Sequence, residues 1–581
     1  MTGVQTCALP IYRVINDPLR LPNIINKYFS SAGNNLASKL PPAEHPYMDY
    51  LCNSKSPDTS FFFKPVTPHE VKLEILSMPS NKSYGLYSCP TQLLKCSCDI
   101  ISSVLANFLN KSVNLGAYPS KLKLSKIIPI YKADDETDAC NYRPISLLSN
   151  FNRIFEKIMY SRMKIFIQKH QLLSSSQYGF RQAHSTEHAI LDMIESIRTN
   201  MDKRLYSCGV FIDLKKAFDT VDHKILLDKL NYYGFRGIVN QWFFSYLTNR
   251  TQTTEINCYI SDREVVSCGV PQGSVLGPLL FLLYVNDIQY CSRKLKFFLF
   301  ADDTNVLYSH DNLKTLELIV NTELHNLLNW LTANKLTLNR KKSNFVIFRP
   351  YQKRLNYLPQ INIFDSEENT NVTLEHKNCI KYLGLLIDEN LSWKNHIYTL
   401  TTKISKTVGI IAKLRHFVPN RTLLDIYKSL IAPYITYGLT SWGTASKTLL
   451  NKILVLQKRV LRLIHFAPVR EHAIPLFLKA KLLPLEFQYY EKIANLMYDI
   501  NTSSAPINIS NLFSKVTSVH SYSTRSSTSE HFYTKKSSLN VQSKAFSRVG
   551  VKIWNGIPTR DRKSTRLNSS HRSLSRMPSS A

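Results

Sequence analysis

The chain has 581 residues and carries 73 lysine and arginine residues against 42 aspartate and glutamate residues, a formal net charge of +31. Apolar residues make up 44% and aromatic residues 11%, too many for a disordered protein, and no apolar run is long enough to cross a membrane. These figures predict a basic globular protein of roughly three to four domains, whose self-repulsion a polyanionic partner would relieve, either nucleic acid or an anionic membrane.

The cysteines and the two ends of the chain add little about fold. The 11 cysteines lie singly, apart from Cys96 and Cys98, without CxxC pairs, which argues against a zinc site and favours a reducing, intracellular compartment. Residues 1–11 and 561–581 resemble translations of one sequencing-library adapter read on opposite strands, and such ends are excluded from fold reasoning. Without them residues 12–560 carry a net charge of +27, and we expect the true N-terminus upstream. A natural basic tail is the alternative.

The N-terminal part is predicted to be mainly helical. Residues 12–60 are rich in Pro, Asn and Ser, which indicates a loosely helical linker followed by loop. Thr67 and Glu70 form a capping box that opens a helix, whose buried face is predicted to hold Val71, Ile75 and Leu76. Apolar residues three to four apart predict further helices at 99–114, 150–169 and 186–199.

The middle of the chain is predicted to contain buried strands. The apolar, aromatic-rich runs Cys208–Leu214 and Lys296–Phe300 are bounded by turn residues, and we expect a helical segment at 216–223 after the first of them. Later helices are predicted at 399–415, 421–432 and 448–466. Ser and Thr dominate 502–545, where we expect little order, and Phe546–Pro558 is again apolar.

Three carboxylates carry the strongest chemical signal. Asp302 and Asp303 are predicted to lie in a hairpin turn after the strand at 296–300, and Asp213 ends the other buried strand. An Asp-rich turn alone is an ordinary structural feature. If the two strand ends lie side by side, however, the three carboxylates gather in one place, and cations must neutralise them. Oxygen-only ligands favour Mg²⁺, and two ions about 4 Å apart promote in-line nucleotidyl transfer.

Three motifs in order make the function more specific. The segments Phe211–His223 (FIDLKKAFDTVDH), Gly269–Pro278 (GVPQGSVLGP) and Phe300–Asp303 (FADD) resemble motifs A, B and C of a reverse transcriptase. Flanking blocks extend the resemblance: 141–146 (NYRPIS), 177–181 (QYGFR), 336–342 (LTLNRKK) as motif D, and 382–388 (YLGLLID) as the primer grip. The sequences of these motifs are similar to those of polymerases from non-LTR (LINE-type) retrotransposons, nearest the jockey-like group.

The resemblance implies an α+β fold, namely a right-hand polymerase with fingers, a palm built on an antiparallel sheet, and a thumb, plus helical N- and C-terminal extensions. The implied parts are a linker and helical extension, the fingers and palm of the reverse transcriptase domain, a thumb and helical region, and a C-terminal segment, at 12–111, 112–387, 388–500 and 501–560. The family usually carries an endonuclease ahead of the polymerase, and we expect truncation to explain why none is visible here.

The resemblance also assigns residues to the metal ions. Asp213 and Asp302 would bind two Mg²⁺ ions, with Asp303 as the supporting third carboxylate. Lys342 would protonate the leaving pyrophosphate, although Arg340 and Lys341 beside it fit a plain phosphate-binding cluster nearly as well.

A second set of residues would bind the nucleotide. Phe218 would lie under the sugar and exclude a 2′-hydroxyl, or else be a core residue. Arg143 and Lys132 would contact the triphosphate, or else be solvated cations. Gln272 would hold the nucleotide by side-chain hydrogen bonds. The basic helices after residue 400 would form a thumb that follows the duplex backbone.

The resulting function is an RNA-directed DNA polymerase that uses an RNA template, a DNA primer and dNTPs, with no membrane partner. Its target-primed mechanism would place it in the nucleus. An RNA-dependent RNA polymerase shares the three carboxylates, but Phe218 and the Ala-Asp-Asp turn argue against it. A catalytically inactive nucleic-acid-binding relic of a decayed element is the alternative outside enzymes.

Overall fold

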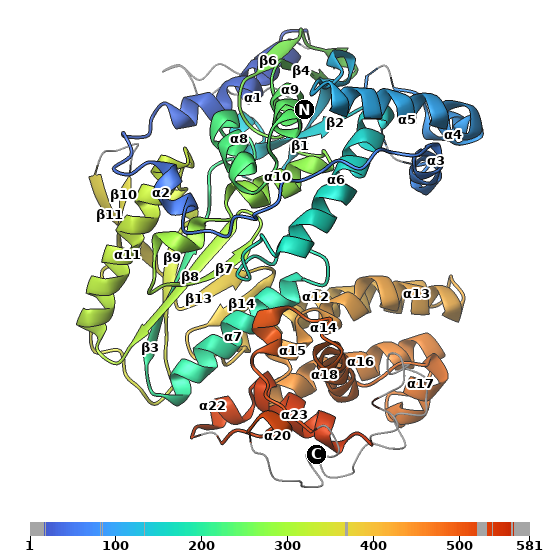
Figure 1. Ribbon diagram of the computed structural model, residues 1–581. Coiled ribbons are helices and arrows are strands. Elements are labelled where there is room, and N and C mark those ends of the chain that lie inside the picture. Colours follow the sequence, from blue (N-terminus) through green and yellow to red (C-terminus); the bar gives the residue numbers. More distant parts are fainter. Residues whose placement is uncertain are drawn as a thin grey trace.

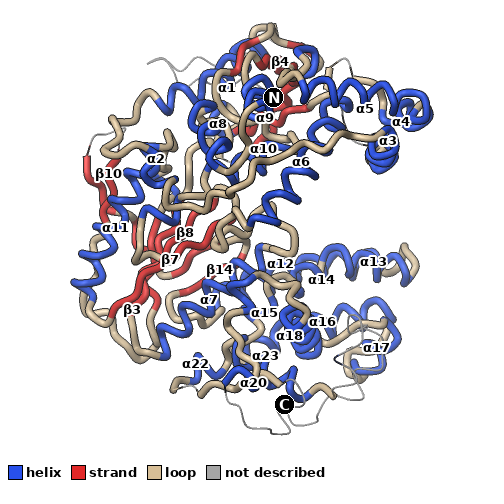
Figure 2. Tube along the Cα trace, in the orientation of Figure 1, coloured by secondary structure: helices blue, strands red, loops and turns tan. Residues whose placement is uncertain are grey.

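The computed structural model describes residues 17, 19–558 and 562, except for residues 82, 84, 87, 133, 366–369, 520–530 and 537. Residues 1–11, and 561–581 apart from Arg562, therefore lie outside the described residues. The fold is mixed α/β, with the strands in one half of the molecule and a mainly helical region in the other (Figures 1 and 2).

A five-stranded sheet forms the centre of the strand-rich half, in the order β12-β9-β3-β8-β7. Its strands are antiparallel except for the β12 and β9 pair. Their bounds are β3 Tyr206–Ile212, β7 Lys296–Phe300, β8 Asp303–His310, β9 Asn344–Phe348 and β12 Glu375–His376. Alternate residues of β3 enter two different hydrophobic clusters, Val210 in one and Phe211 in the other. The buried strands predicted near 208–214 and at 296–300 are confirmed.

A second sheet lies in the upper part of Figure 1, in the order β2-β1-β4-β5, with β6 also paired to β4. Its strands are β1 Leu124–Tyr131, β2 Tyr142–Leu147, β4 Arg250–Ile256, β5 Tyr259–Ile260 and β6 Glu264–Val266. The first helices of the chain are α1 Leu21–Ala37, α2 Tyr47–Leu51, α3 Pro68–Ser77, α4 Thr91–Cys96, α5 Cys98–Asn114 and α6 Asn150–His170, of which α1 packs on β4 and β6 of this sheet and α2 lies beside the central sheet's helix α11. The helices between and beside the sheets are α7 Thr186–Asp202, α8 His223–Tyr232, α9 Ile238–Leu247, α10 Leu276–Tyr284 and α11 Leu313–Ala333.

Two short hairpins lie outside these sheets, one beside α11 and one between the central sheet and the helical region. They are formed by β10 Asn362–Asp365 with β11 Thr370–Thr373, and by β13 Cys379–Tyr382 with β14 Leu385–Asp388. The helical region then contains α12 Lys394–Leu414, α13 Asn420–Leu430, α14 Ala432–Thr436, α15 Leu439–Trp442, α16 Lys447–His465, α17 Ala473–Ala480 and α18 Leu485–Asn501. The last described helices are α19 Ile507–Ser510, α20 Val516–Val519, α22 Asn540–Ser543 and α23 Phe546–Gly556.

Several helix predictions are confirmed, and two local expectations need correction. The Thr67 and Glu70 capping box is present, but Leu76 is 45% exposed instead of buried, because the buried face of α3 is narrow. The helical character expected in the linker is confirmed by α1, whose buried Asn26 donates to the Asp262 carbonyl at 2.9 Å. Little order was expected at 502–545; residues 520–530 and 537 lie outside the described residues, and the others include three short helices.

Helix α7 links the central sheet to the end of the chain. Glu195 is almost fully buried and accepts hydrogen bonds from the backbone N–H groups of Phe546 and Ser547, at 2.7 and 3.1 Å. These two residues begin α23, so the carboxylate satisfies donors that a helix leaves without intrahelical partners. Arg198, one turn further along α7, donates to Thr444 Oγ1 at 2.6 Å. The C-terminal helix is therefore fixed to α7 by buried polar contacts.

Candidate active site

The register of the central sheet brings the three predicted carboxylates to one end of it. Thr304 of β8 pairs with Ile212 of β3 on one side and with Leu299 of β7 on the other. Asp303 precedes Thr304 and Asp213 follows Ile212, so both lie one residue beyond these pairs, toward the same end of the sheet. Asp302 lies in the turn before β8. The structure thus places Asp213, Asp302 and Asp303 together, as expected from the sequence.

Gln177 stabilises the turn that carries Asp302 through side-chain hydrogen bonds. Ala301 has a positive φ of 56°, which is unusual for a residue with a side chain. The Gln177 side-chain oxygen accepts from the backbone N–H groups of Ala301 and Gly179, at 3.0 and 2.8 Å. Gln177 belongs to the QYGFR block, so this segment stabilises the strained turn between β7 and β8.

The carboxylates interact electrostatically. Partial desolvation, together with the charges of Asp302 and Asp213, raises the pKa of Asp303 to about 6. The pKa of Asp302 is also raised, first by burial and then by Asp213. Positive charges on Arg143 and Lys132 act in the opposite direction on Asp302. The site therefore concentrates negative charge that a cation would stabilise.

Arg143 and Lys132 both come from the β1 and β2 hairpin of the second sheet. Arg143 pairs with Ile130 across this hairpin, and the backbone N–H of Lys132 donates to the Asn141 carbonyl at 2.9 Å. Both side chains are exposed. Their positive charges oppose the rise in the pKa of Asp302, so the hairpin supplies two cations that act electrostatically on this carboxylate.

The segment after Asp213 is a turn, and the helix expected at 216–223 is absent there. Lys216 has a positive φ of 47°, which an α-helix does not allow. Helix α8 begins only at His223, where Asp222 Oδ1 accepts from the Ile225 N–H at 3.0 Å. The prediction of a helix at 216–223 is wrong because hydrophobic periodicity carries no information about a residue with a positive φ.

Phe218 lies in this turn and is only partly buried. Its ring stacks on Phe281 of α10, with 4.5 Å between the ring centroids and an interplanar angle of 24°. Phe180 contacts it edge-on, with a centroid distance of 6.5 Å. One part of the ring is thus fixed by aromatic packing while another part stays accessible, unlike a residue of the inner core.

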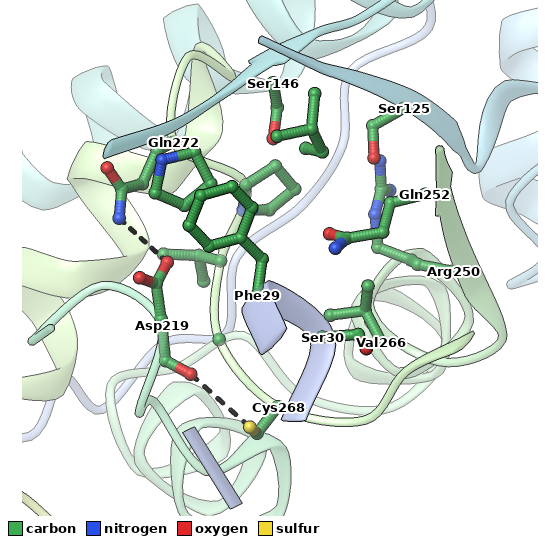
Figure 3. Close-up of a pocket in the computed structure, with 15 residues that line it drawn as sticks. Phe29, Ser30, Ser125, Ser146, Asp219, Arg250, Gln252, Val266, Cys268 and Gln272 are labelled. Atoms are coloured by element: carbon green, nitrogen blue, oxygen red, sulfur yellow. Dashed lines mark hydrogen bonds between the residues drawn. The ribbon is translucent and has the colours of Figure 1, made fainter. Parts of the chain in front are cut away.

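Gln272 in motif B contacts motif A directly. Its Nε2 donates to Asp219 Oδ1 at 2.8 Å, and its carbonyl accepts from the Ser146 N–H at 2.7 Å (Figure 3). Desolvation raises the pKa of Asp219 to about 6, although the hydrogen bond from Gln272 and the charge of Lys216 oppose this rise. Asp219 was not predicted as a site residue, although its place six residues after Asp213 in motif A was a usable signal.

Two glycines allow the motif B loop to approach its neighbours. Gly269 and Gly273 have φ values of +86° and +117°. A Cβ atom added to Gly269 would lie 2.8 Å from the Asp219 carbonyl oxygen, and one added to Gly273 would lie 2.7 Å from the Ser146 carbonyl oxygen. Any side chain at either position would therefore push the loop away from motif A or from β2.

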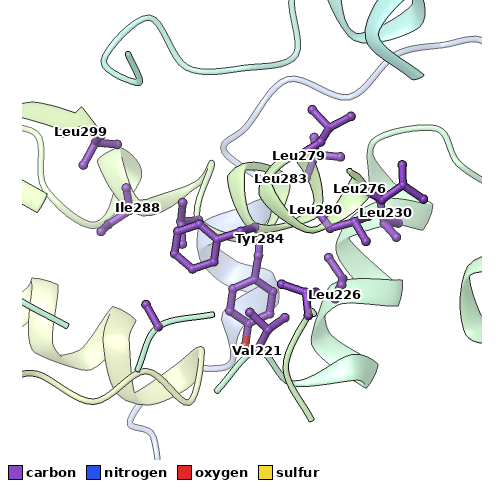
Figure 4. Close-up of a cluster of buried hydrophobic side chains, with 14 of the residues drawn as sticks. Val221, Leu226, Leu230, Leu276, Leu279, Leu280, Leu283, Tyr284, Ile288 and Leu299 are labelled. Carbon is purple, nitrogen blue, oxygen red and sulfur yellow. The ribbon is translucent and has the colours of Figure 1, made fainter. Parts of the chain in front are cut away.

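Helix α10 continues the motif B loop into the hydrophobic core. It is apolar all round and packs against α8. Figure 4 shows part of the buried cluster around these helices, whose labelled residues include Val221, Leu226, Leu230, Leu276, Leu279, Leu280, Leu283 and Tyr284. The Tyr284 hydroxyl donates to the Asn334 carbonyl at 2.6 Å. Below it, Lys229 Nζ donates to Asp287 Oδ1 at 2.5 Å, and both side chains are fully buried. This core gives the loop a rigid base.

Motif D lies beside Asp213. Asn339 Nδ2 donates to Asp213 Oδ2 at 2.7 Å, and the Asn339 backbone N–H donates to the Asp213 carbonyl at 2.8 Å. Lys342 follows in a short 3₁₀ turn and is exposed. Asn339 is a second residue that the sequence did not reveal, because its role depends on a contact between distant segments.

The three carboxylates are the candidate donors for a divalent metal. In the described part of the chain, no three His, Cys, Asp or Glu side chains converge closely enough to hold an ion as they stand, and one Asp213 oxygen is engaged by Asn339. The donors nevertheless suit a hard cation, since all are carboxylate oxygens, and burial followed by the neighbouring negative charges raises the pKa of Asp302 and Asp303. The chemistry of the residues present therefore fits a divalent metal.

Comparison with known proteins agrees with this geometry. Residues 130–387 match the family described as "Reverse transcriptase (RNA-dependent DNA polymerase)". This segment is a reverse transcriptase domain. It contains the three carboxylates, Phe218, Gln272 and Lys342, whereas the helices before β1 lie outside it.

The chain around the reverse transcriptase domain is also similar to known polymerases. It is 29% identical over 418 residues to "RNA-directed DNA polymerase from mobile element jockey" of Drosophila melanogaster, covering 69% of this chain and 44% of that protein. It is 29% identical to "Probable RNA-directed DNA polymerase from transposon BS", covering 73% of this chain and 47% of that protein. It is 30% identical to "Probable RNA-directed DNA polymerase from transposon X-element", covering 69% of this chain and 44% of that protein. Both are from Drosophila melanogaster.

The resemblance to non-LTR retrotransposon polymerases is thus confirmed. The chain spans less than half the length of these relatives. Among the described residues, none of the helices has the length and apolar character needed to cross a membrane.

Proposed function

We propose that this chain is the RNA-directed DNA polymerase of a non-LTR retrotransposon, which extends a DNA 3′ end on an RNA template. The observation that supports this most is the sheet register that gathers Asp213, Asp302 and Asp303 at one end of the central sheet, where the charges of Arg143 and Lys132 act on Asp302. Nucleotidyl transfer requires carboxylates that hold metal ions and cations that bind the triphosphate beside them, and these residues would supply both.

Asp213 and Asp302 would hold two Mg²⁺ ions, with Asp303 in support. When bound there, the ions would supply activation of the primer 3′-hydroxyl and stabilisation of the leaving pyrophosphate. Arg143 and Lys132 would bind the triphosphate through charge-assisted hydrogen bonds. Lys342 would give a proton to the pyrophosphate.

The remaining site residues would select the nucleotide. The accessible part of the Phe218 ring, fixed on Phe281, would meet the sugar and exclude a 2′-hydroxyl. Gln272 would bind the nucleotide from the other side. Its hydrogen bond to Asp219 keeps it on the motif A turn, so the two motifs would recognise one sugar together.

In this proposal the molecule is a right-hand polymerase with an α+β fold. Fingers and palm would occupy 112–387, a thumb and helical region 388–500, a helical extension 12–111, and a C-terminal segment 501–560. The exposed lysines of α12, Lys403, Lys406 and Lys413, and the half-buried Arg415 after its end would follow the backbone of the template and primer duplex. The partners would be an RNA template, a DNA primer and dNTPs, and target-primed synthesis would occur in the nucleus.

Primer extension tests the proposal. The purified chain, a DNA primer annealed to RNA, dNTPs and Mg²⁺ should give extended product, and Asp302→Ala should abolish extension while duplex binding remains. Asp311→Ala is the matched control, because this exposed residue follows the far end of β8. Binding without extension by the unchanged protein would instead indicate an inactive relic, and incorporation of rNTPs in place of dNTPs would indicate an RNA polymerase.

A further inference from the structure

Helix α1 precedes the reverse transcriptase domain in sequence, yet it forms one wall of a cavity beside Gln272. Figure 3 shows Phe29 of α1 pointing into this cavity, between Gln272 and Gln252. The cavity measures about 40 Å³ and is also lined by Asp219. Ligand pockets usually measure about 300–1,000 Å³. The cavity is therefore a packing gap, and α1 fills the space against motifs A and B.

Gly33 brings α1 into direct contact with the motif A turn. A Cβ atom added to Gly33 would lie 2.1 Å from the Asp219 carbonyl oxygen and 2.5 Å from Cys268 Sγ. Neither distance is tolerable for a real side chain, and the Asp219 carbonyl is backbone that cannot rotate away. Cys268 directly precedes the motif B loop and itself donates to the Asp219 carbonyl at 3.4 Å. Gly33 thus lies where motif A, motif B and α1 meet.

A second contact joins α1 to the same turn. Lys216 Nζ donates to the Tyr28 hydroxyl at 2.8 Å and lies 3.9 Å from the centre of the Tyr28 ring. Lys216 is the residue whose positive φ shapes the turn. On the other side, Asn26 fixes α1 to the second sheet, because it accepts from Gln252 Nε2 at 3.1 Å and from Thr254 Oγ1 at 3.0 Å.

We propose that α1 is part of the nucleotide site, and that Gly33 and Tyr28 are positioning residues that hold the motif A turn against the motif B loop. They act through Phe218, Asp219 and Gln272, which the turn and the loop carry. This inference rests on the proposed polymerase function. Its consequence is that residues outside the reverse transcriptase domain determine how tightly a dNTP is held.

Steady-state and binding measurements on the full chain test this role. Gly33→Ala should raise the KM for dNTP at least about tenfold while kcat changes less than about threefold, because a small displacement of binding groups is costly. It should also weaken dNTP binding to a complex with a dideoxy-terminated primer, in which no turnover occurs. Gly556→Ala in α23 is the control, since a Cβ atom there meets nothing within 4 Å. Tyr28→Phe, which keeps the ring, should raise the KM about threefold and serves if Gly33→Ala does not fold.

The outcomes separate this inference from the proposed function. If the unchanged chain extends no primer, the polymerase proposal fails. If it extends primers and both α1 variants keep the original KM and dNTP affinity, the positioning role alone is overturned. A loss of thermal stability with an unchanged KM would likewise show that α1 only supports the fold.

Discussion

Asn339 Nδ2 lies 2.7 Å from Asp213 Oδ2, so motif D holds one oxygen of the first carboxylate in the candidate site. The backbone of Asn339 also donates to the Asp213 carbonyl. Two contacts from one residue therefore fix both the main chain and the side chain at the end of β3. Partners of this kind orient ligands for a metal ion.

Replacing Asn339 by alanine should lower primer extension about 10- to 100-fold, the usual cost of losing such a partner. The Mg²⁺ concentration needed for half-maximal activity should rise as well, because the Asp213 carboxylate is then free to rotate. A metal titration of both proteins measures this. Unchanged metal dependence in Asn339→Ala would contradict the role.

Phe218→Val should relax the exclusion of ribonucleotides. A smaller side chain leaves room for a 2′-hydroxyl, and one steric contact of this size is worth about 10- to 200-fold in discrimination. The ratio of kcat/KM for dNTP and rNTP measures the effect. Phe244→Val, at an exposed position of α9, is the control, and equal ratios in both variants would refute the gate.

Asp219 should make the stability of the protein depend on pH. Its pKa is about 6 in the folded protein, above the ordinary value of 3.8, so the folded state binds the proton more tightly than the unfolded state. The stabilisation is complete below the unfolded pKa and is lost as the pH rises through about 6. Asp219→Asn removes this dependence. When the pH rises from 5 to 7, the free energy of unfolding of the variant should therefore increase by about 1 kcal/mol relative to that of the original protein. If the free energy of unfolding changes with pH in the same way in both proteins, the raised pKa of Asp219 is excluded.

The buried pair of Lys229 and Asp287 should be sensitive to single replacements. Asp287→Ala leaves a buried ammonium without its carboxylate, which costs about 3–5 kcal/mol. It also removes the acceptor of the Trp330 indole N–H. Replacing both residues together, as Lys229→Met with Asp287→Leu, should recover most of the lost stability in denaturant unfolding. A double variant as unstable as the single one would show that the ion pair itself is the stabilising interaction.

Local patterns were enough to predict much of the fold. The helix expected at 150–169 is α6 Asn150–His170, and the strand expected at 296–300 is β7. In both cases one run of residues determines the element. The gathering of Asp213 with Asp302 was also predictable, because each ends a buried strand.

Contacts between distant segments were not predictable in the same way. The positive φ of Lys216, the hydrogen bond from Asn339 to Asp213 and the packing of α1 on motif A each depend on a neighbour far away in sequence. Hydrophobic spacing carries no information about such partners. It also misplaced Leu76, since a periodic stripe does not show how much of it a neighbouring helix covers.

The contact of Glu195 with Phe546 joins residues that lie 351 positions apart. A ribosome that has released α7 must therefore add most of the remaining chain before this carboxylate meets its partners. Until then Glu195 has Arg198 on its own helix as an ion-pair partner at 3.5 Å, but lacks the two backbone donors of α23, and burial without full hydrogen bonding is costly. The docking of α23 on α7 is consequently a late event in synthesis, and a polypeptide that stops before α23 should leave this carboxylate in water.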